Sequence, residues 1–184
     1  MTFSKTRRFV KDKYNPNIDY TINASSKNVN RRNITETITN AVIDYYCHKR
    51  WACHREIGLL RWGKLRVDVF AFNLGGDFVG IEVKSSKADF NSDHKMSNYL
   101  KYFDKFYIAC PLDIKDYILE RLPSEKMGVF CLGTDGYLWC VKPAKNMKGL
   151  KNKKRRELLL RLAFRSSEYS PRTRKRRTRR FYDK

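Results

Sequence analysis

Residues 65–84 read LRVDVFAFNLGGDFVGIEVK, two strand-like segments joined by a Gly-Gly turn, and this stretch decides the fold. Side chains in a strand alternate between its two faces. Asp68 therefore lies opposite the valines of the first segment. Glu82 and Lys84 lie together, opposite the valines and isoleucine of the second. If the segments pair as a hairpin, Asp68, Glu82 and Lys84 converge on one side of the sheet and the other side is left apolar.

The surrounding patterns extend this hairpin into a predicted α/β domain. Strand patterns at 53–60, 65–72 and 78–84 predict an antiparallel meander. A helix is expected from near Asn33, a second over 88–103, and then a buried strand at 106–109. The order α-β-β-β-α-β predicts a mixed central sheet flanked by helices. Further segments are expected as a helix at 114–122, a hairpin of 129–132 with 137–141, and a last helix at 158–164.

The composition divides the chain into a core and basic extensions. We predict a polar arm at 1–30, the α/β domain at 31–145, and a basic helix with an arginine-rich tail at 146–184. The net charge of +21 indicates a polyanionic partner, with nucleic acid ahead of a membrane surface. The basic residues assigned to nucleic-acid contact are Lys153, Lys154, Arg155, Arg156, Arg174, Lys175, Arg176, Arg177, Arg179 and Arg180.

The expected location is the cytoplasm, in association with nucleic acid, with a phage or virion origin left open. The chain has no apolar run of membrane-spanning length and no secretory signal pattern, and its five cysteines are an odd number.

The acidic pair and its lysine indicate metal chemistry. Two carboxylates are usual oxygen ligands of Mg²⁺, which retains water and accepts substrate phosphate oxygens. We expect Asp68 and Glu82 to bind Mg²⁺, or Mn²⁺, with the Val83 carbonyl as a further ligand. Lys84 is expected to orient or help deprotonate the attacking water and to stabilise developing charge. The alternative is an ordinary salt-bridged strand.

Residues 53–111 also resemble the MmcB-like DNA-repair proteins of the PD-(D/E)XK nuclease superfamily. The family pattern joins Arg-x-Asp-Val, Glu-x-Lys-x-Ser, Asp-Phe, Asp-x-Lys, a tyrosine and an aromatic strand entry. Its positions here are Arg66, Asp68, Val69, Glu82, Lys84, Ser86, Asp89, Phe90, Asp93, Lys95, Tyr99, Tyr102, Asp104, Phe106 and Tyr107. Met96 stands where the family usually has tryptophan. The resemblance implies a restriction-endonuclease-like core and DNA, rather than RNA, as substrate.

The resemblance also implies supporting residues around the metal pair. Arg66, Ser86, Lys95 and Tyr99 are expected to contact nucleic acid, with Lys95 near the scissile phosphate and Tyr99 stacking or hydrogen-bonding. A further acid is usual in this superfamily, and two candidates remain. Glu56 precedes the Arg-x-Asp strand and is preferred. Glu36 lies on the first helix, where it also forms a capping-box-like pair with Asn33.

Two functions follow from these features. The first is a metal-dependent nuclease that hydrolyses phosphodiester bonds in DNA, in repair or in phage nucleic-acid processing. The alternative is a non-catalytic nucleic-acid-binding protein, phage- or virion-associated, on a nuclease-like fold. The intact Asp68, Glu82 and Lys84 set favours the enzyme, since a binding module has no physical reason to keep it.

Overall fold

The computed structural model describes residues 31–60, 65–147 and 149–166. The chain divides into two compact units, Met1–Gly149 and Leu150–Lys184. The predicted arm at 1–30 and the arginines and lysine of the tail at 174–180 lie outside the described residues. In the second unit the described structure is one helix, α5 (Asn152–Ser166), which includes the helix expected at 158–164.

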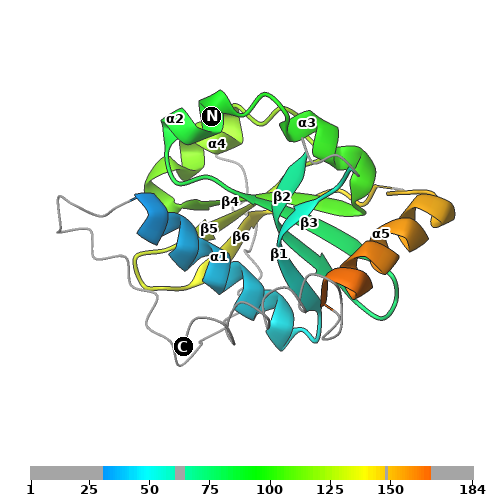
Figure 1. Ribbon diagram of the computed structural model, residues 1–184. Helices are drawn as coiled ribbons and strands as arrows, with labels where there is room; N and C mark the ends of the chain where they lie inside the picture. The colour runs from blue at the N-terminus through cyan, green and yellow to red at the C-terminus, as the bar shows by residue number, and fades with distance from the viewer. Residues whose placement is uncertain (1–30, 61–64, 148, 167–184) are drawn as a thin grey trace, which may run out of the picture. The chain divides into compact units, whose positions relative to one another are not determined.

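The first unit is built on one six-stranded sheet whose strands follow one another in chain order (Figure 1). The strands are β1 (Ala52–Gly58), β2 (Arg66–Phe72), β3 (Phe78–Val83), β4 (Lys105–Pro111), β5 (Gly128–Leu132) and β6 (Leu138–Lys142). Strands β1 to β3 form the predicted antiparallel meander. Strands β4 and β5 run parallel to β3, and β6 returns antiparallel to β5. The predicted mixed sheet and the order α-β-β-β-α-β are confirmed.

A short turn fixes the β2–β3 hairpin. The Asp77 N–H donates to the Asn73 side-chain oxygen at 3.0 Å, and the Asn73 amide donates to the Asp77 carboxylate at 2.9 Å. Gly76 has a φ of +87°, a conformation that favours glycine. Because register decides which face each side chain occupies, this turn sets the face on which Asp68 and Glu82 lie.

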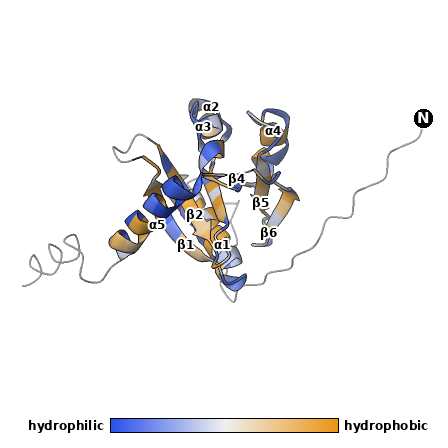
Figure 2. Ribbon diagram, turned by 90° about the vertical axis from the view of Figure 1, so that its right-hand side faces the viewer, coloured by the Kyte–Doolittle hydropathy of each residue, from blue (hydrophilic) through white to orange (hydrophobic). Residues whose placement is uncertain are grey.

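Helix α1 (Arg31–His48) covers one face of the sheet. Its buried side chains, among them Ile38, Val42 and Tyr45, pack on the apolar side of β2 to β5. The Tyr45 and Phe130 rings meet edge to face at 5.2 Å between centroids. The ribbon is most hydrophobic along the central strands (Figure 2), as expected for strands covered on both sides.

The opposite face is covered by short helices. These are α2 (Lys87–Ser92), α3 (Met96–Tyr99), the 3-10 helices η1 (Leu100–Tyr102) and η2 (Leu112–Ile114), and α4 (Lys115–Glu120). Phe70, Phe103 and Phe106 form an aromatic core beneath them. The Phe103 ring lies directly over Gly80, where an added Cβ would come within 2.5 Å of it. This side of the sheet therefore combines an aromatic half with the polar half that contains Asp68 and Glu82.

The single helix predicted over 88–103 is wrong. The chain breaks at Asp93, which has φ −94° and ψ 89°, and resumes helical structure at Met96. The Asp93 carboxylate accepts the Lys95 N–H at 2.9 Å and the Lys84 ammonium at 2.6 Å. Local side-chain bonds of this kind compete with the helix. Lys95, the N-cap of α3, and Tyr99, within α3, both follow the break.

The capping-box interpretation of Asn33 and Glu36 is also wrong. Arg31 is already helical, so both residues lie inside α1. The Asn33 carbonyl accepts the Thr37 hydroxyl at 2.7 Å, as an interior helical carbonyl can. The role that competed with an acidic function for Glu36 is therefore absent.

Candidate active site

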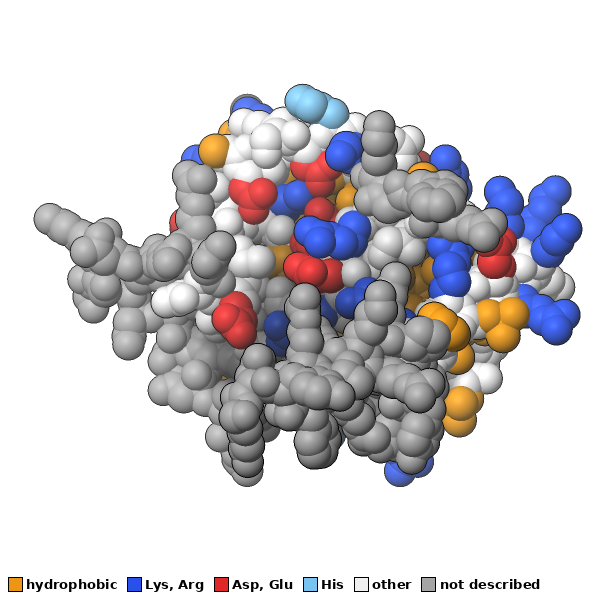
Figure 3. Space-filling view, in the orientation of Figure 1, with side chains coloured by type: hydrophobic (Ala, Val, Ile, Leu, Met, Phe, Trp, Pro, Cys, Tyr) orange, Lys and Arg blue, Asp and Glu red, His pale blue; other side chains and the backbone are white. Residues whose placement is uncertain are grey.

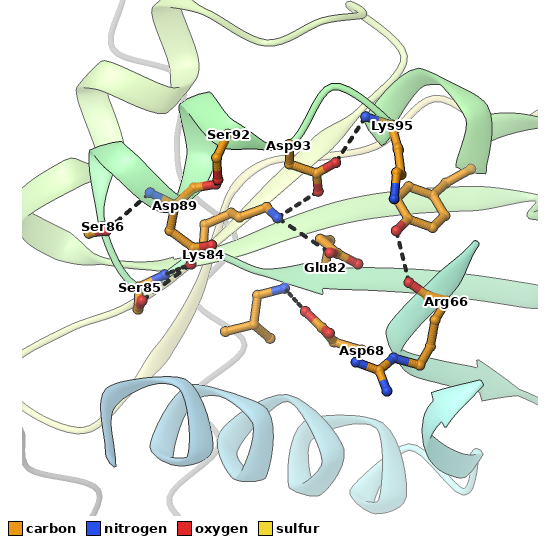
Figure 4. A network of polar contacts seen from close by, with 12 residues as sticks. Arg66, Asp68, Glu82, Lys84, Ser85, Ser86, Asp89, Ser92, Asp93 and Lys95 are labelled. Atoms are coloured by element: carbon orange, nitrogen blue, oxygen red, sulfur yellow. Dashed lines mark hydrogen bonds and ion pairs between the residues drawn. The ribbon is translucent and has the colours of Figure 1, made fainter. Parts of the chain in front are cut away.

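The β2–β3 hairpin brings Asp68 and Glu82 to the same side of the sheet. Val69 pairs with Ile81, and one further step of this register sets Asp68 opposite Glu82. The Val83 N–H donates to Asp68 Oδ2 at 2.8 Å, which fixes the carboxylate beside the end of β3 (Figure 4). Strand β3 is buried along its whole length, and only 7 % of Glu82 is exposed. The geometry predicted from strand alternation is therefore present.

Lys84 lies between two acidic side chains. Its ammonium donates to Glu82 Oε1 at 3.3 Å and to Asp93 Oδ2 at 2.6 Å (Figure 4). The Lys84 side chain is 5 % exposed. Burial lowers its pKa, but the nearby carboxylates outweigh burial and raise the pKa above the ordinary value. Lys84 is thus a protonated cation at neutral pH, held by Asp93 as well as by its strand neighbour.

The surroundings of Glu82 disfavour the charged form of its carboxylate. Burial, and then the charge of Asp68, raise its pKa to about 8, against the opposing effect of Lys84. Burial likewise raises the pKa of Asp68, while the Val83 N–H and Lys84 act in the other direction. Within the described residues, Glu82 Oε2 is buried and has no hydrogen-bond partner. Such an atom is costly unless a cation or a proton satisfies it.

The segment after β3 is fixed by reciprocal capping. Ser86 is the N-cap of α2, and its hydroxyl accepts the Asp89 N–H at 3.2 Å. The Asp89 carboxylate accepts the Ser85 N–H at 2.9 Å. Ser86, predicted to contact nucleic acid, therefore has a capping role that explains its presence. These bonds set the direction in which the chain leaves Lys84.

Glu56 lies near the pair but not within it. Its register position on β1 is opposite Asp68, and its φ of 53° is unusual for a residue with a side chain. The Glu56 carboxylate pairs with Arg66 at 3.4 Å, and the two side chains are 61 % and 59 % exposed. Glu36 is exposed on α1, the helix on the other face of the sheet. The preference for Glu56 stays a prediction.

The predicted partners on the broken helix have different surroundings. Lys95 is exposed and is the N-cap residue of α3. The Tyr99 hydroxyl donates to the Arg66 carbonyl at 2.8 Å, and its ring stacks on Phe106 at 5.2 Å. Tyr99 is buried and packs as a core residue, whereas Arg66 remains exposed at the site.

Asp93 is a residue of the site that strand alternation does not indicate. It contacts Lys84 more closely than Glu82 does, yet it lies outside the hairpin. The Lys84 ammonium holds the pKa of the Asp93 carboxyl below its ordinary value, against the effect of burial. The only sequence signal for it is the Asp-x-Lys position of the family pattern.

The surface over this site is mixed in charge. In the space-filling view, acidic and basic side chains lie side by side in the middle of the face (Figure 3). In the described part of the chain no group of three or more His, Cys, Asp or Glu side chains is arranged to hold an ion. A metal ion here would thus have two carboxylates at most, together with backbone or substrate oxygens.

The basic residues of α5 that the structure describes are mainly at the surface. Lys153, Lys154 and Arg156 are exposed, and Arg155 is half-buried. Leu158 and Leu162 are the buried side chains of the same helix. The helix thus has exposed basic side chains near its N-terminus and buried leucines at i, i+4 spacing further along, as expected for an amphipathic helix.

The fold and the site define a mixed α/β protein with a carboxylate and lysine cluster at the centre of a helix-flanked sheet. This architecture is consistent with a restriction-endonuclease-like core. The chain belongs to the family described as DNA repair protein MmcB-like, whose model matches residues 23–174. The family gives the protein a DNA-related role.

Among solved structures, the chain is similar to a protein of unknown function, SPO1766 from Silicibacter pomeroyi. The two are 27 % identical, with a TM-score of 0.59, over 74 % of this chain and 94 % of the other. No curated protein matches this chain. No helix among the described residues is long and apolar enough to cross a membrane.

Proposed function

We propose that this protein is a divalent-metal-dependent nuclease that hydrolyses phosphodiester bonds in DNA. The observation that carries the proposal is the unsatisfied Glu82 Oε2 on the same face as Asp68, beside the Lys84 ammonium. Burial and mutual repulsion oppose ionisation of this pair, so the metal-free protein can hold both carboxylates charged only at a cost in stability. A cation between the two carboxylates removes that cost.

The residues present fit Mg²⁺ or Mn²⁺. The Asp68 Oδ2 atom accepts the Val83 N–H, so Oδ1 is the oxygen that can bind the metal ion. Glu82 can bind the same ion through Oε2. Protein sites for Mg²⁺ often use one or two carboxylates and complete the shell with water and substrate phosphate. The Val83 carbonyl is the proposed third protein ligand.

Each group has a distinct task in hydrolysis. When bound, a divalent ion neutralises charge on the phosphate and makes water more acidic. Lys84, held by Asp93 at 2.6 Å, presents a fixed positive charge that orients the nucleophile and stabilises the charge developing on the phosphate. Its raised pKa favours this electrostatic task over deprotonation of the attacking water. Arg66, exposed beside the site, is proposed to contact the DNA backbone.

A cleavage assay tests the proposal. Purified protein is incubated with single- and double-stranded DNA and RNA in Mg²⁺, Mn²⁺ or EDTA. We expect metal-dependent cleavage of DNA that falls about 100-fold or more in Asp68→Asn and in Glu82→Gln. Asp116→Asn is the matched control, because this carboxylate is 81 % exposed and outside the site. Cleavage that persists in EDTA, or that is unchanged in Asp68→Asn, refutes the proposal.

The same assay separates the enzyme from the alternative function. Salt-sensitive DNA binding with no cleavage under any metal condition favours a non-catalytic DNA-binding protein on this fold. For the enzyme, Asp68→Asn should abolish cleavage and keep DNA affinity within about threefold, since phosphate contacts by Lys and Arg supply most of the binding.

A further inference from the structure

A pocket opens beside Asp93, a residue that contacts Lys84. It encloses about 340 Å³, and Asp93 is one of its lining residues. The same carboxylate contacts Lys84 at 2.6 Å, so pocket and site share a wall. A volume near the lower end of the range for ligand sites suits one small planar group. Its lining includes residues on both sides of the break between α2 and α3.

The lining combines buried apolar side chains with exposed polar ones. Phe90 and Met96 are 4 % and 3 % exposed and contribute only a small apolar surface. Asn91, His94 and Ser97 are exposed. Arg121, which is also exposed and lines the pocket, offers a planar guanidinium for the face of a base. Amide, hydroxyl and imidazole groups can hydrogen-bond to its edge.

Tyr117 on α4 contacts two lining residues of the pocket, Asn91 and Arg121. Its hydroxyl exchanges hydrogen bonds with the Asn91 side chain at 2.9 and 3.1 Å. The Arg121 guanidinium, which also lines the pocket, lies over the Tyr117 ring at 4.1 Å and pairs with Glu120 at 2.8 Å. A guanidinium in this position can stack on a base or contact a phosphate.

We propose that this pocket receives one unpaired nucleobase of the DNA strand next to the bond that is cleaved. The inference rests on the proposed function, because the shared Asp93 wall sets the base beside the catalytic lysine. It adds that the substrate presents an unpaired or extruded nucleotide, since a paired base cannot leave the stack without a cost. A fully paired duplex should therefore bind through backbone contacts alone.

Binding in EDTA with the full-length protein tests this inference independently of cleavage. Two matched oligonucleotides are compared, a paired duplex and the same duplex with a single unpaired nucleotide. Ser97→Trp is designed to fill the pocket. Asn98→Trp is the control, because Asn98 is adjacent in sequence and exposed but does not line the pocket. We expect Ser97→Trp to weaken binding of the unpaired oligonucleotide about tenfold and to leave the paired one within twofold, consistent with the loss of a base-stacking site. Asn98→Trp should change neither.

Fluorescence gives a second readout that needs no bulky variant. We expect 2-aminopurine at the unpaired position to change its emission on binding the wild-type protein, and the change to fall at least twofold in Arg121→Gln but not in Lys126→Gln. Equal weakening of both oligonucleotides by Ser97→Trp, or no change in emission with the wild type, overturns the pocket assignment. Selective base binding without metal-dependent cleavage would instead leave the pocket standing and refute the nuclease proposal.

Discussion

Glu82→Gln should remove most of the pH dependence of folding stability in the metal-free protein. The Glu82 side chain is 10 % exposed, and burial with the charge of Asp68 raises its pKa from 4.5 to about 8. The unfolded chain releases this proton near pH 4.5, whereas the folded protein keeps it until about pH 8. Between these values the folded state binds more protons, so the contribution of Glu82 to stability is fully present below pH 4.5 and is lost as the pH rises through 8.

The size of the effect follows from the width of this window. A difference of one bound proton changes the free energy of unfolding by about 1.4 kcal/mol per pH unit. Across the window this gives an upper limit of roughly 5 kcal/mol. Relaxation around the charge reduces this, and we expect a loss of about 2–5 kcal/mol in the wild type. Gln keeps the shape of the side chain and removes its titration. A smaller slope should remain from Asp68, whose pKa burial also raises.

Urea unfolding from pH 4.5 to 9 in EDTA measures this directly. Glu120→Gln is the control, because Glu120 is 69 % exposed and its pair with Arg121 contributes little. Addition of Mg²⁺ at pH 8 should stabilise the wild type and have a much smaller effect on Glu82→Gln. If the wild type and Glu82→Gln have the same slope of stability against pH, then burial and Asp68 do not raise the Glu82 pKa, and no uncompensated pair is present for a cation to stabilise.

Three further outcomes test other parts of the structure. Asp93→Asn should destabilise the fold by about 2–4 kcal/mol in urea unfolding, because it leaves the buried Lys84 ammonium with a weaker partner; a change below 0.5 kcal/mol would contradict this reading. Gly80→Ala should lower stability by about 1–3 kcal/mol, since its Cβ would lie 2.5 Å from the Phe103 ring, and an unchanged melting temperature would show that the ring is free to move. Deletion of 165–184 should weaken DNA binding and reduce the slope of log affinity against log salt; equal slopes for the two proteins would exclude a role of this segment in phosphate contact.

Strand alternation predicted the central part of the site because it is a local property of the chain. Asp68 and Glu82 each interrupt a run of β-branched and apolar residues, and a two-residue period leaves them one face to occupy. The Gly-Gly turn then set the pairing of the strands. The face, the register and the proximity of Lys84 to Glu82 all followed from these two features.

The break after α2 was not predictable in the same way. The sequence around Asp93 has a helical period, and the chain leaves the helix because Asp93 bonds to Lys84, a residue on a neighbouring element. The positive φ of Glu56, 53°, is likewise not indicated by the strand pattern of 53–60. For Asp93 a contact between elements decides the conformation, and a pattern within one element does not contain it.

The bond from the Val83 N–H to the Asp68 carboxylate has a practical consequence. Strands β2 and β3 pair as far as Val69 and Ile81, and this side-chain bond takes over where the ladder ends. The Val83 amide is therefore hydrogen-bonded directly to one carboxylate of the acidic pair. The amide proton resonance of Val83 in an NMR spectrum should shift when Asp68 is protonated or binds an ion. NMR can thus follow ion binding at this site without a dye or a substitution.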